Sequence, residues 1–306
     1  FYEEVNVENI IFCSSPFQVL VAKEVVQTVS EDFIGIYLKM SNDASQTFYA
    51  ERMAELCKEV LVLEGKTVFN DIQEALKDRI ISNLYLASLD NPVALSVFNP
   101  STMNLYTFDD GTANIIKTSA FYSRSVRNRT KILRAALRIK TTMNTVKEKS
   151  LLHYTIYPNI SNIINKTKVV SIFNTENYDN VRSDEKIIKV FLGQPFYNSS
   201  IRNKDLVEQI VKKLDIDFYI PHPREDYRVE NVAYVESKLV FEELFAKEFN
   251  NKKCIIYTFY SGAILNLLNV SSVKLISILP KELDDLIIPM KVVNESYDLF
   301  KRLGVE

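Results

Sequence analysis

The chain has few of the features that mark the commonest nucleotide-binding and membrane proteins. Only six of its 306 residues are glycine, and no GxGxxG or GxxxxGK[ST] motif occurs. This disfavours a dinucleotide-binding Rossmann domain and a P-loop enzyme. No hydrophobic run approaches the roughly 18 residues that a membrane-spanning helix needs. The sequence starts at Phe1 rather than methionine, which leaves open that a signal or anchor was removed.

Charge and cysteine content argue against further classes. A formal net charge of -2 argues against a dedicated nucleic-acid-binding protein, which is normally strongly basic. The three cysteines, Cys13, Cys57 and Cys254, are widely spaced and lie among apolar residues. We therefore expect buried thiols rather than disulfides or a zinc site.

The chain does contain a regular alternation of short apolar β-branched runs with helical patterns. At 306 residues and 47% hydrophobic composition it is long enough for two domains. The alternation predicts an α/β fold with two βαβ domains in tandem and parallel sheets. Helices are expected at residues 18–29 and 45–57, and strands at residues 9–13, 33–38, 60–63, 84–87, 105–108, 169–173, 187–192, 218–220, 232–235, 254–259 and 273–278.

A polar segment, residues 174–185, has the composition of a surface linker. We predict a first domain of residues 1–183 and a second of residues 184–306. Ligands of open parallel sheets bind beyond the carboxyl ends of the strands. The loops that follow the predicted strands are therefore the candidate site.

In the first domain, residues 14–18 form a hydroxyl-rich loop that suits either a helix cap or a substrate contact. Asp109 and Asp110, followed by Gly111, suit either a turn or general-base catalysis, because two adjacent carboxylates raise the pKa of one of them. We expect this pair and a histidine of the second domain to face each other across a cleft.

In the second domain, Gly193, Gln194 and Pro195 follow a buried strand, and the glycine allows close approach of a ligand to the backbone. Pro221 and Pro223 stiffen the backbone around His222, which favours a functional histidine over a structural one. The other histidine, His153, has no such setting. The last loop, Tyr260, Ser261 and Gly262, precedes an apolar helix and suits either a cap or an anion site, where it would hold one phosphate together with His222.

These motifs, taken together, resemble the bacterial sialyltransferases of glycosyltransferase family 52, the lipooligosaccharide sialyltransferase group. The matching stretches are residues 11–13, 84–89, 108–112, 153–156, 222–224 and 257–263, in the same order. The resemblance implies a GT-B fold of two Rossmann-like domains, the first on the acceptor side and the second binding the CMP-sugar. It also implies inverting, metal-independent transfer of sialic acid from CMP-sialic acid to a terminal galactose of a lipooligosaccharide or capsular glycan, usually in α2,3 linkage. No cofactor is expected.

The resemblance also implies residue roles. His222 of the HP motif, after Pro221, would bind the CMP phosphate and act as the acid for its departure. Ser261 and Gly262 would hold the same phosphate, Glu242 would bind the ribose hydroxyls, and Gly193, Gln194 and Pro195 would border the nucleotide pocket. These residue types suit an oxocarbenium-like transition state, in which the leaving phosphate needs charge-assisted hydrogen-bond donors.

The chain departs from the family pattern at one position. Some members place the aspartate assigned as the base directly after the Gly-x-Pro of the second domain, where this chain has Phe196. The base is then Asp110 or Asp109, with Asp205 as the alternative. Two other functions compete with sialic acid transfer. The chain could be a transferase of this family that uses another nucleotide-sugar donor, or a non-catalytic homologue that binds a glycan or a nucleotide.

A basic segment runs from Arg124 to Lys149, with no acid between Asp110 and Glu148. It suits either a solvated helix face or a basic amphipathic helix on an anionic membrane surface. We expect a bacterial cytoplasmic protein, with peripheral attachment to the inner membrane as the second possibility, and a homodimer with exchanged segments is a further expectation of the resemblance.

Overall fold

The computed structural model describes residues 7–122, 128–137, 139–173 and 186–306. The chain divides into two units, Phe1–Ile172 and Phe173–Glu306, each described by itself below. The boundary predicted between residues 183 and 184 lies outside the described residues.

Unit 1 is built on one sheet of seven strands in the order β3-β2-β1-β4-β5-β6-β7, and every pairing between them is parallel. All six residues of the strand that begins at Phe33 are buried, as expected for a parallel strand covered on both faces. The strands are β1 (Val7–Cys13), β2 (Phe33–Leu38), β3 (Glu59–Leu63), β4 (Ile80–Leu86), β5 (Asn104–Phe108), β6 (Ser150–Thr155) and β7 (Thr167–Val169).

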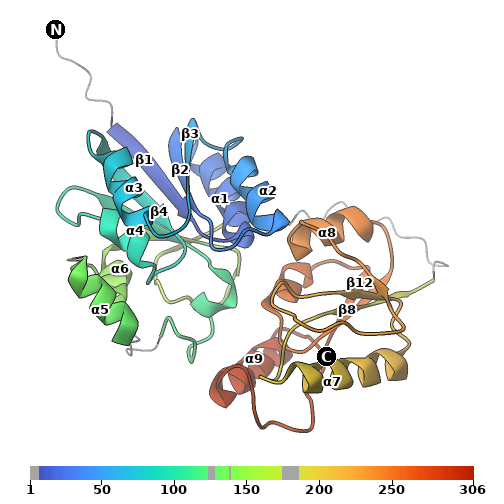
Figure 1. Ribbon diagram of the computed structural model, residues 1–306. Helices are drawn as coiled ribbons and strands as arrows, with labels where there is room; N and C mark the ends of the chain where they lie inside the picture. The colour runs from blue at the N-terminus through green and yellow to red at the C-terminus, as the bar shows by residue number, and fades with distance from the viewer. Residues whose placement is uncertain (1–6, 123–127, 138, 174–185) are drawn as a thin grey trace. The chain divides into compact units, whose positions relative to one another are not determined.

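Helices cover both faces of this sheet, as Figure 1 shows for the pairs α1 with α2 and α3 with α4. Ile34 and Ile36 share a core with α3 and α4, whereas a Cβ on Gly35, which points the other way, would touch Met53 of α2. The helices of the unit are α1 (Pro16–Val29), α2 (Ala44–Met53), α3 (Val68–Leu76), α4 (Pro92–Val97), the 3-10 helix η1 (Gly111–Asn114), α5 (Asn128–Ala136) and α6 (Met143–Lys149).

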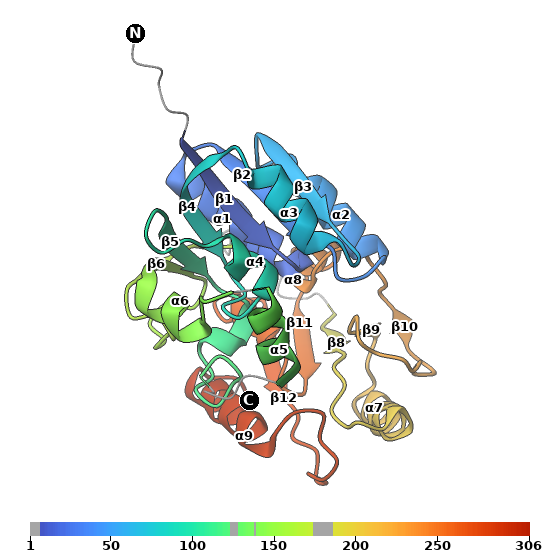
Figure 2. The ribbon, with the colours of Figure 1, turned by 60° about the vertical axis from the view of Figure 1, so that its left-hand side comes forward.

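Unit 2 has a second parallel sheet, with strand order β10-β9-β8-β11-β12 (Figure 2). The strands are β8 (Ile188–Leu192), β9 (Phe218–Ile220), β10 (Ala233–Tyr234), β11 (Cys254–Thr258) and β12 (Val273–Ser277). The helices are α7 (Ser200–Leu214), α8 (Phe241–Glu248), the 3-10 helix η3 (Gly262–Leu267) and α9 (Met290–Arg302).

Most of the predicted elements are confirmed within a few residues. The structure differs from the prediction at two strands near the end of unit 1. The strand predicted at residues 169–173 lies earlier in the chain, as β7, which ends at Val169. Strand β6 was not predicted. The three cysteines are free, as expected; Cys13 and Cys254 are buried and Cys57 is half-buried.

Candidate active site

The carboxyl ends of β1, β4 and β5 form the candidate site of unit 1. The chain runs from β1 outward to β2 and β3, then returns to place β4 on the other side of β1. Such a reversal of strand order leaves a crevice at the ends of the two central strands, which is where ligands of open α/β sheets bind. The loops after β1 and β4 therefore flank this switch point.

Gln18, on the first turn of α1, joins these loops. Its side-chain amide donates to Ser88 Oγ at 2.9 Å and to Asp110 Oδ1 at 2.8 Å. Its amide oxygen accepts from the Ser14 backbone N–H at 2.7 Å. Gln18 is buried, and both the nitrogen and the oxygen of its side-chain amide are hydrogen-bonded, which fixes its position.

Asp110 lies at the centre of this group. Its second oxygen, Oδ2, accepts from Ser88 Oγ at 3.1 Å, and its backbone N–H donates to Asn114 Oδ1 at 2.8 Å. Burial raises the pKa of Asp110, the donors Gln18 and Ser88 counteract part of that rise, and the negative charges nearby add to it. As a residue Asp110 is half-buried, and each oxygen of its carboxyl group has one donor, Gln18 or Ser88. A carboxylate with a raised pKa suits general-base catalysis.

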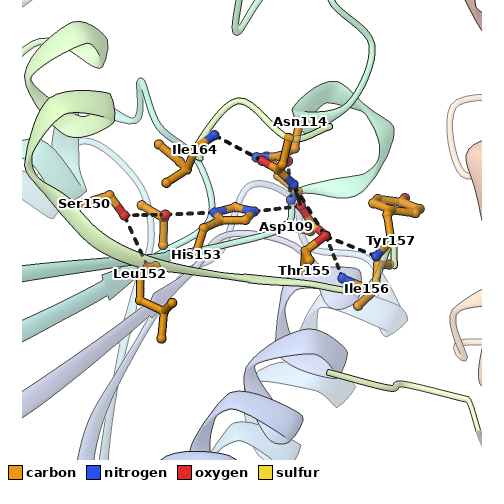
Figure 3. Close-up of polar contacts among 12 residues, drawn as sticks. Asp109, Asn114, Ser150, Leu152, His153, Thr155, Ile156, Tyr157 and Ile164 are labelled. Atoms are coloured by element: carbon orange, nitrogen blue, oxygen red, sulfur yellow. Dashed lines mark hydrogen bonds and ion pairs between the residues drawn. The ribbon is translucent and has the colours of Figure 1, made fainter. Parts of the chain in front are cut away.

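Asp109 has a different environment, shown in Figure 3. It is fully buried. Four groups donate to its carboxylate: His153 Nε2 at 2.8 Å and Asn162 Nδ2 at 3.0 Å to Oδ1, and Thr155 Oγ1 at 2.6 Å and the Ile156 N–H at 2.7 Å to Oδ2. These donors fill about all four lone-pair sites of a carboxylate. Asp109 therefore anchors the end of β5 to the end of β6, whereas the carboxylate of Asp110 accepts from two side chains, Gln18 and Ser88.

His153, which the sequence gives no role, is the buried partner of Asp109. Because a carboxylate only accepts hydrogen bonds, Nε2 of His153 carries a proton. The other ring nitrogen, Nδ1, lies 2.8 Å from Thr107 Oγ1, which in turn lies 2.7 Å from Ser150 Oγ. This chain of polar groups links β5 and β6 inside the unit (Figure 3).

In unit 2 the candidate site lies at the carboxyl ends of β8, β9 and β11. His222 follows β9, and its Nδ1 accepts from the Arg224 backbone N–H at 3.1 Å. Burial, and secondarily the Arg224 charge, lower the pKa of His222 to about 4. The ring is therefore neutral at neutral pH, with its proton on Nε2. Nε2–H is thus the group that His222 offers to a ligand.

Gly193 follows β8 and packs against the side chains of this loop. Its N–H donates to the Ile220 carbonyl at 2.8 Å. A Cβ at this position would lie 2.6 Å from the Tyr219 hydroxyl and would also collide with Glu225 Oε1. Glu225 accepts from the Tyr219 hydroxyl at 2.9 Å, and burial raises the pKa of Glu225 to about 7. A side chain at residue 193 would therefore require Tyr219 and Glu225 to move.

The remaining residues predicted for the donor pocket lie near β11. Gln194 Oε1 accepts from the Tyr260 N–H at 3.1 Å, and the Pro195 carbonyl accepts from the Tyr260 hydroxyl at 3.4 Å. These contacts hold the loops after β8 and β11 together. Ser261 precedes η3, and its hydroxyl does not cap that helix. Ser261 and Gly262 are half-buried.

Glu242 lies in the first turn of α8. It is 2% exposed, and its Oε1 accepts from Asn266 Nδ2 of η3 at 2.7 Å. Burial raises the pKa of Glu242 to about 7. The pair connects α8 to the helix that begins at Gly262.

Phe196, which occupies the place of the base in some family members, and Asp205, the alternative base, lie in different environments. Phe196 is fully buried and packs against Phe259 and Tyr260. Its N–H donates to Asn203 Oδ1 at 3.0 Å. Asp205 is exposed on α7. The structure thus brings Asp110 into a polar cluster and leaves Asp205 on a solvent-facing helix surface.

Within the described residues, no three His, Cys, Asp or Glu side chains come together in a way that could hold a metal ion. The residues that sequence reasoning missed are Ser88, Asn114, His153 and Asn266. A polar residue directly after a buried strand is the signal that could have selected Ser88. Nothing in the sequence indicates that it meets Gln18, because the order of strands in the sheet decides that contact.

Comparisons with known proteins give the following matches. The sequence model of glycosyltransferase family 52 matches residues 30–282. The chain is 33% identical over 279 residues to an N-acetyllactosaminide α-2,3-sialyltransferase of Haemophilus influenzae, covering 87% of this chain and 90% of that protein. It is 31% identical over 314 residues to a CMP-N-acetylneuraminate:β-galactoside α-2,3-sialyltransferase of Pasteurella multocida, covering 97% of each.

Among solved structures, a UDP-glucosyltransferase from Polygonum tinctorium superposes with a TM-score of 0.54 at 8% identity, covering 99% of this chain and 85% of that one. At this identity the likeness concerns the fold alone. It agrees with the two parallel α/β sheets of this chain, and the predicted GT-B fold class is confirmed.

Proposed function

Because the chain belongs to glycosyltransferase family 52, we propose that it transfers sialic acid from CMP-sialic acid to a terminal galactose, with inversion and in α2,3 linkage. The observation that carries the proposal is the match to two α-2,3-sialyltransferases over nearly their whole length. A match of this extent includes both units and therefore supports both a donor and an acceptor side.

On the donor side, the neutral ring of His222 supports a contact with the CMP phosphate. Nε2–H donates to a phosphate oxygen, and the bound negative charge raises the pKa of the ring so that it can act as the acid. Ser261 and Gly262 hold the same phosphate with a free hydroxyl and a backbone N–H. Glu242 accepts from the ribose hydroxyls, and Gly193 lets the nucleotide approach the backbone.

On the acceptor side, Asp110 is the proposed base. The galactose hydroxyl gives its proton to Asp110 as its oxygen bonds to C2 of sialic acid. The bond between C2 and the phosphate oxygen breaks, and its electron pair leaves with CMP. The transition state is oxocarbenium-like, so the phosphate needs charge-assisted donors at the moment of departure. Asp109 has its oxygens filled by four donors and is instead the anchor of the Asp110 loop.

Incubation with CMP-sialic acid and lactose, followed by detection of CMP and sialyllactose, tests the proposal. Asp110→Asn should lower kcat about 100-fold or more, the usual loss for a general base. Asp205→Asn, the matched control, should keep near-normal transfer because Asp205 is exposed on α7. If Asp110→Asn keeps near-normal transfer and Asp205→Asn abolishes it, the base is Asp205.

The same assay separates the competing functions. CMP binding without turnover would indicate a non-catalytic homologue. A chain with no affinity for CMP would use another nucleotide-sugar or act differently, and the proposed donor would be wrong.

The setting of the reaction is a further part of the proposal. We propose a lipooligosaccharide or capsular glycan as the source of the acceptor galactose, a bacterial cytoplasmic location and a homodimer, which sedimentation analysis of the purified protein can test. Among the described residues, none of the helices has the length and apolar content that crossing a bilayer requires.

A further inference from the structure

The side-chain amide of Gln18 fits its cluster in one orientation. Its oxygen, Oε1, lies 2.7 Å from the backbone nitrogen of Ser14 and 3.2 Å from the Ser14 hydroxyl. Because a backbone N–H only donates, the amide oxygen must face Ser14. The amide nitrogen then faces Ser88 Oγ at 2.9 Å and Asp110 Oδ1 at 2.8 Å, with one hydrogen for each. Both of these oxygens therefore accept from Gln18.

This arrangement decides where the hydroxyl hydrogen of Ser88 points. Ser88 Oγ accepts from Gln18, so its own hydrogen is left for Asp110 Oδ2 at 3.1 Å. A hydroxyl oxygen has two lone pairs. Among the residues that the structure describes, only Gln18 donates to Ser88 Oγ. The second lone pair can thus accept from the hydroxyl of a substrate.

Ser88 is also better placed than Asp110 to meet a sugar hydroxyl. It lies two residues after the end of β4, in a loop that flanks the switch point of the sheet, and it is half-buried. The carboxyl group of Asp110 is buried, and burial is the main cause of its raised pKa. Each of its oxygens already accepts from a side chain of the protein. A hydroxyl that donates to Ser88 would be connected to Asp110 through one serine.

We propose that Ser88 is a further catalytic residue, which takes the proton of the acceptor hydroxyl and passes its own proton to Asp110. The inference rests on the proposed function, in which Asp110 is the base. The O–H bond of the acceptor breaks as its oxygen bonds to C2 of sialic acid. That proton binds to Ser88 Oγ, and the former Ser88 hydrogen moves to Asp110 Oδ2. The electron pair of the broken bond between C2 and the phosphate oxygen leaves with CMP.

The relay preserves the number of hydrogen bonds in the cluster. Before the transfer, Gln18 and the acceptor donate to Ser88, and Ser88 donates to Asp110. After it, Gln18 and the protonated Asp110 donate to Ser88, and Ser88 donates to the former acceptor oxygen. Because Oδ1 continues to accept from Gln18, the proton stays on Oδ2. Only hydrogens move, so no buried polar group loses its partner during the reaction.

The unsubstituted protein allows the first test. The relay moves two protons together, whereas direct transfer to Asp110 moves one. A single turnover of CMP-sialic acid with lactose, which excludes product release from the measured rate, is followed in mixtures of H₂O and D₂O. The rate should fall along a curve as the fraction of deuterium rises. A straight line, or a rate that does not depend on deuterium, would overturn the relay.

Variants of Ser88 provide the second test. Ser88→Ala should lower kcat about 100-fold, the lower end of the usual contribution of proton transfer by a side chain, with little change in the KM for CMP-sialic acid. Ser88→Thr keeps a hydroxyl and should recover most of the rate. Ser96→Ala is the matched control, because Ser96 is a half-buried serine of α4 whose hydroxyl donates to the Val93 carbonyl at 2.6 Å. It should keep near-normal transfer.

The pH dependence of kcat/KM distinguishes the relay from a merely structural role. The hydrogen bond from Ser88 lowers the pKa of Asp110, whereas the charges of Asp90 and Asp109 raise it, and the thiol of Cys13 also interacts with this carboxylate. Loss of the hydroxyl raises the pKa of Asp110 further. The acidic limb of the profile should therefore move to higher pH in Ser88→Ala and return in Ser88→Thr.

Asp110→Asn, measured beside these variants, separates the relay from the choice of base. If Asp110→Asn keeps near-normal transfer, Asp110 is not the base and the relay is wrong with it. If Asp110→Asn abolishes transfer while Ser88→Ala keeps the rate and pH profile of the unsubstituted protein, Asp110 remains the base and only the relay is wrong.

Discussion

At the scale of single residues, burial brings the pKa of two carboxyl groups of unit 2 close to neutral pH. Burial raises the pKa of Glu225 and of Glu242 to about 7 each. A carboxyl group whose pKa is higher in the folded than in the unfolded state stabilises the fold below its unfolded pKa. That stabilisation is lost as the pH rises through the folded pKa. For these two groups the loss falls between about pH 4.5 and pH 7.

Glu242→Gln removes this titration and keeps an oxygen for Asn266. Relative to the variant, the free energy of unfolding of the unsubstituted protein should fall by roughly 2 to 3 kcal/mol between pH 5 and pH 8. Urea unfolding at the two pH values measures it. Glu74→Gln, at an exposed position of α3, is the control, and it should change the free energy of unfolding by the same amount at both pH values. If Glu242→Gln also changes the free energy of unfolding equally at both pH values, the pKa of Glu242 is not raised.

The residues of the site differ in how far the sequence reveals them. Asp110 and His222 can be selected because each follows a predicted strand in a stiff or glycine-containing loop. The different environments of Asp109 and Asp110 cannot be predicted from the sequence, because the two residues are adjacent and chemically identical. Strand direction turns one side chain toward His153 inside the unit and leaves the other at the end of the sheet.

At the scale of the elements, Asp109 joins the ends of β5 and β6. Asp109→Asn would place an amide N–H₂ against groups that are themselves donors. We expect a loss of unfolding free energy of about 2 to 4 kcal/mol, with a lower Tm. Asp205→Asn, on the exposed face of α7, should leave Tm nearly unchanged. A stable but inactive Asp109→Asn would instead make Asp109 a catalytic residue.

Strand β6 illustrates why elements can be missed. Its sequence, Ser150 to Thr155, carries a histidine and a threonine where a buried strand is expected to be apolar. The polar side chains are tolerated because they bond to Thr107 of the neighbouring strand β5 and to Asp109, which directly follows that strand. Long-range pairing, rather than local propensity, makes this segment a strand.

At the scale of the whole molecule, metal dependence is open to a simple measurement. The proposed mechanism meets the phosphate charge with His222, a hydroxyl and backbone N–H groups. The initial rate should therefore be unchanged in excess EDTA. A loss of rate that Mg²⁺ or Mn²⁺ restores would contradict this.

The order of the two sheets along the chain has a consequence for biosynthesis. All strands of the seven-stranded sheet lie before residue 170, and all strands of the five-stranded sheet lie after residue 187. Parallel strands pair only after long crossovers, so each sheet forms slowly. On the ribosome, synthesis of the rest of the chain takes on the order of 10 seconds. During that time the first sheet has every strand it needs, and the second emerges beside a partner that can already be folded.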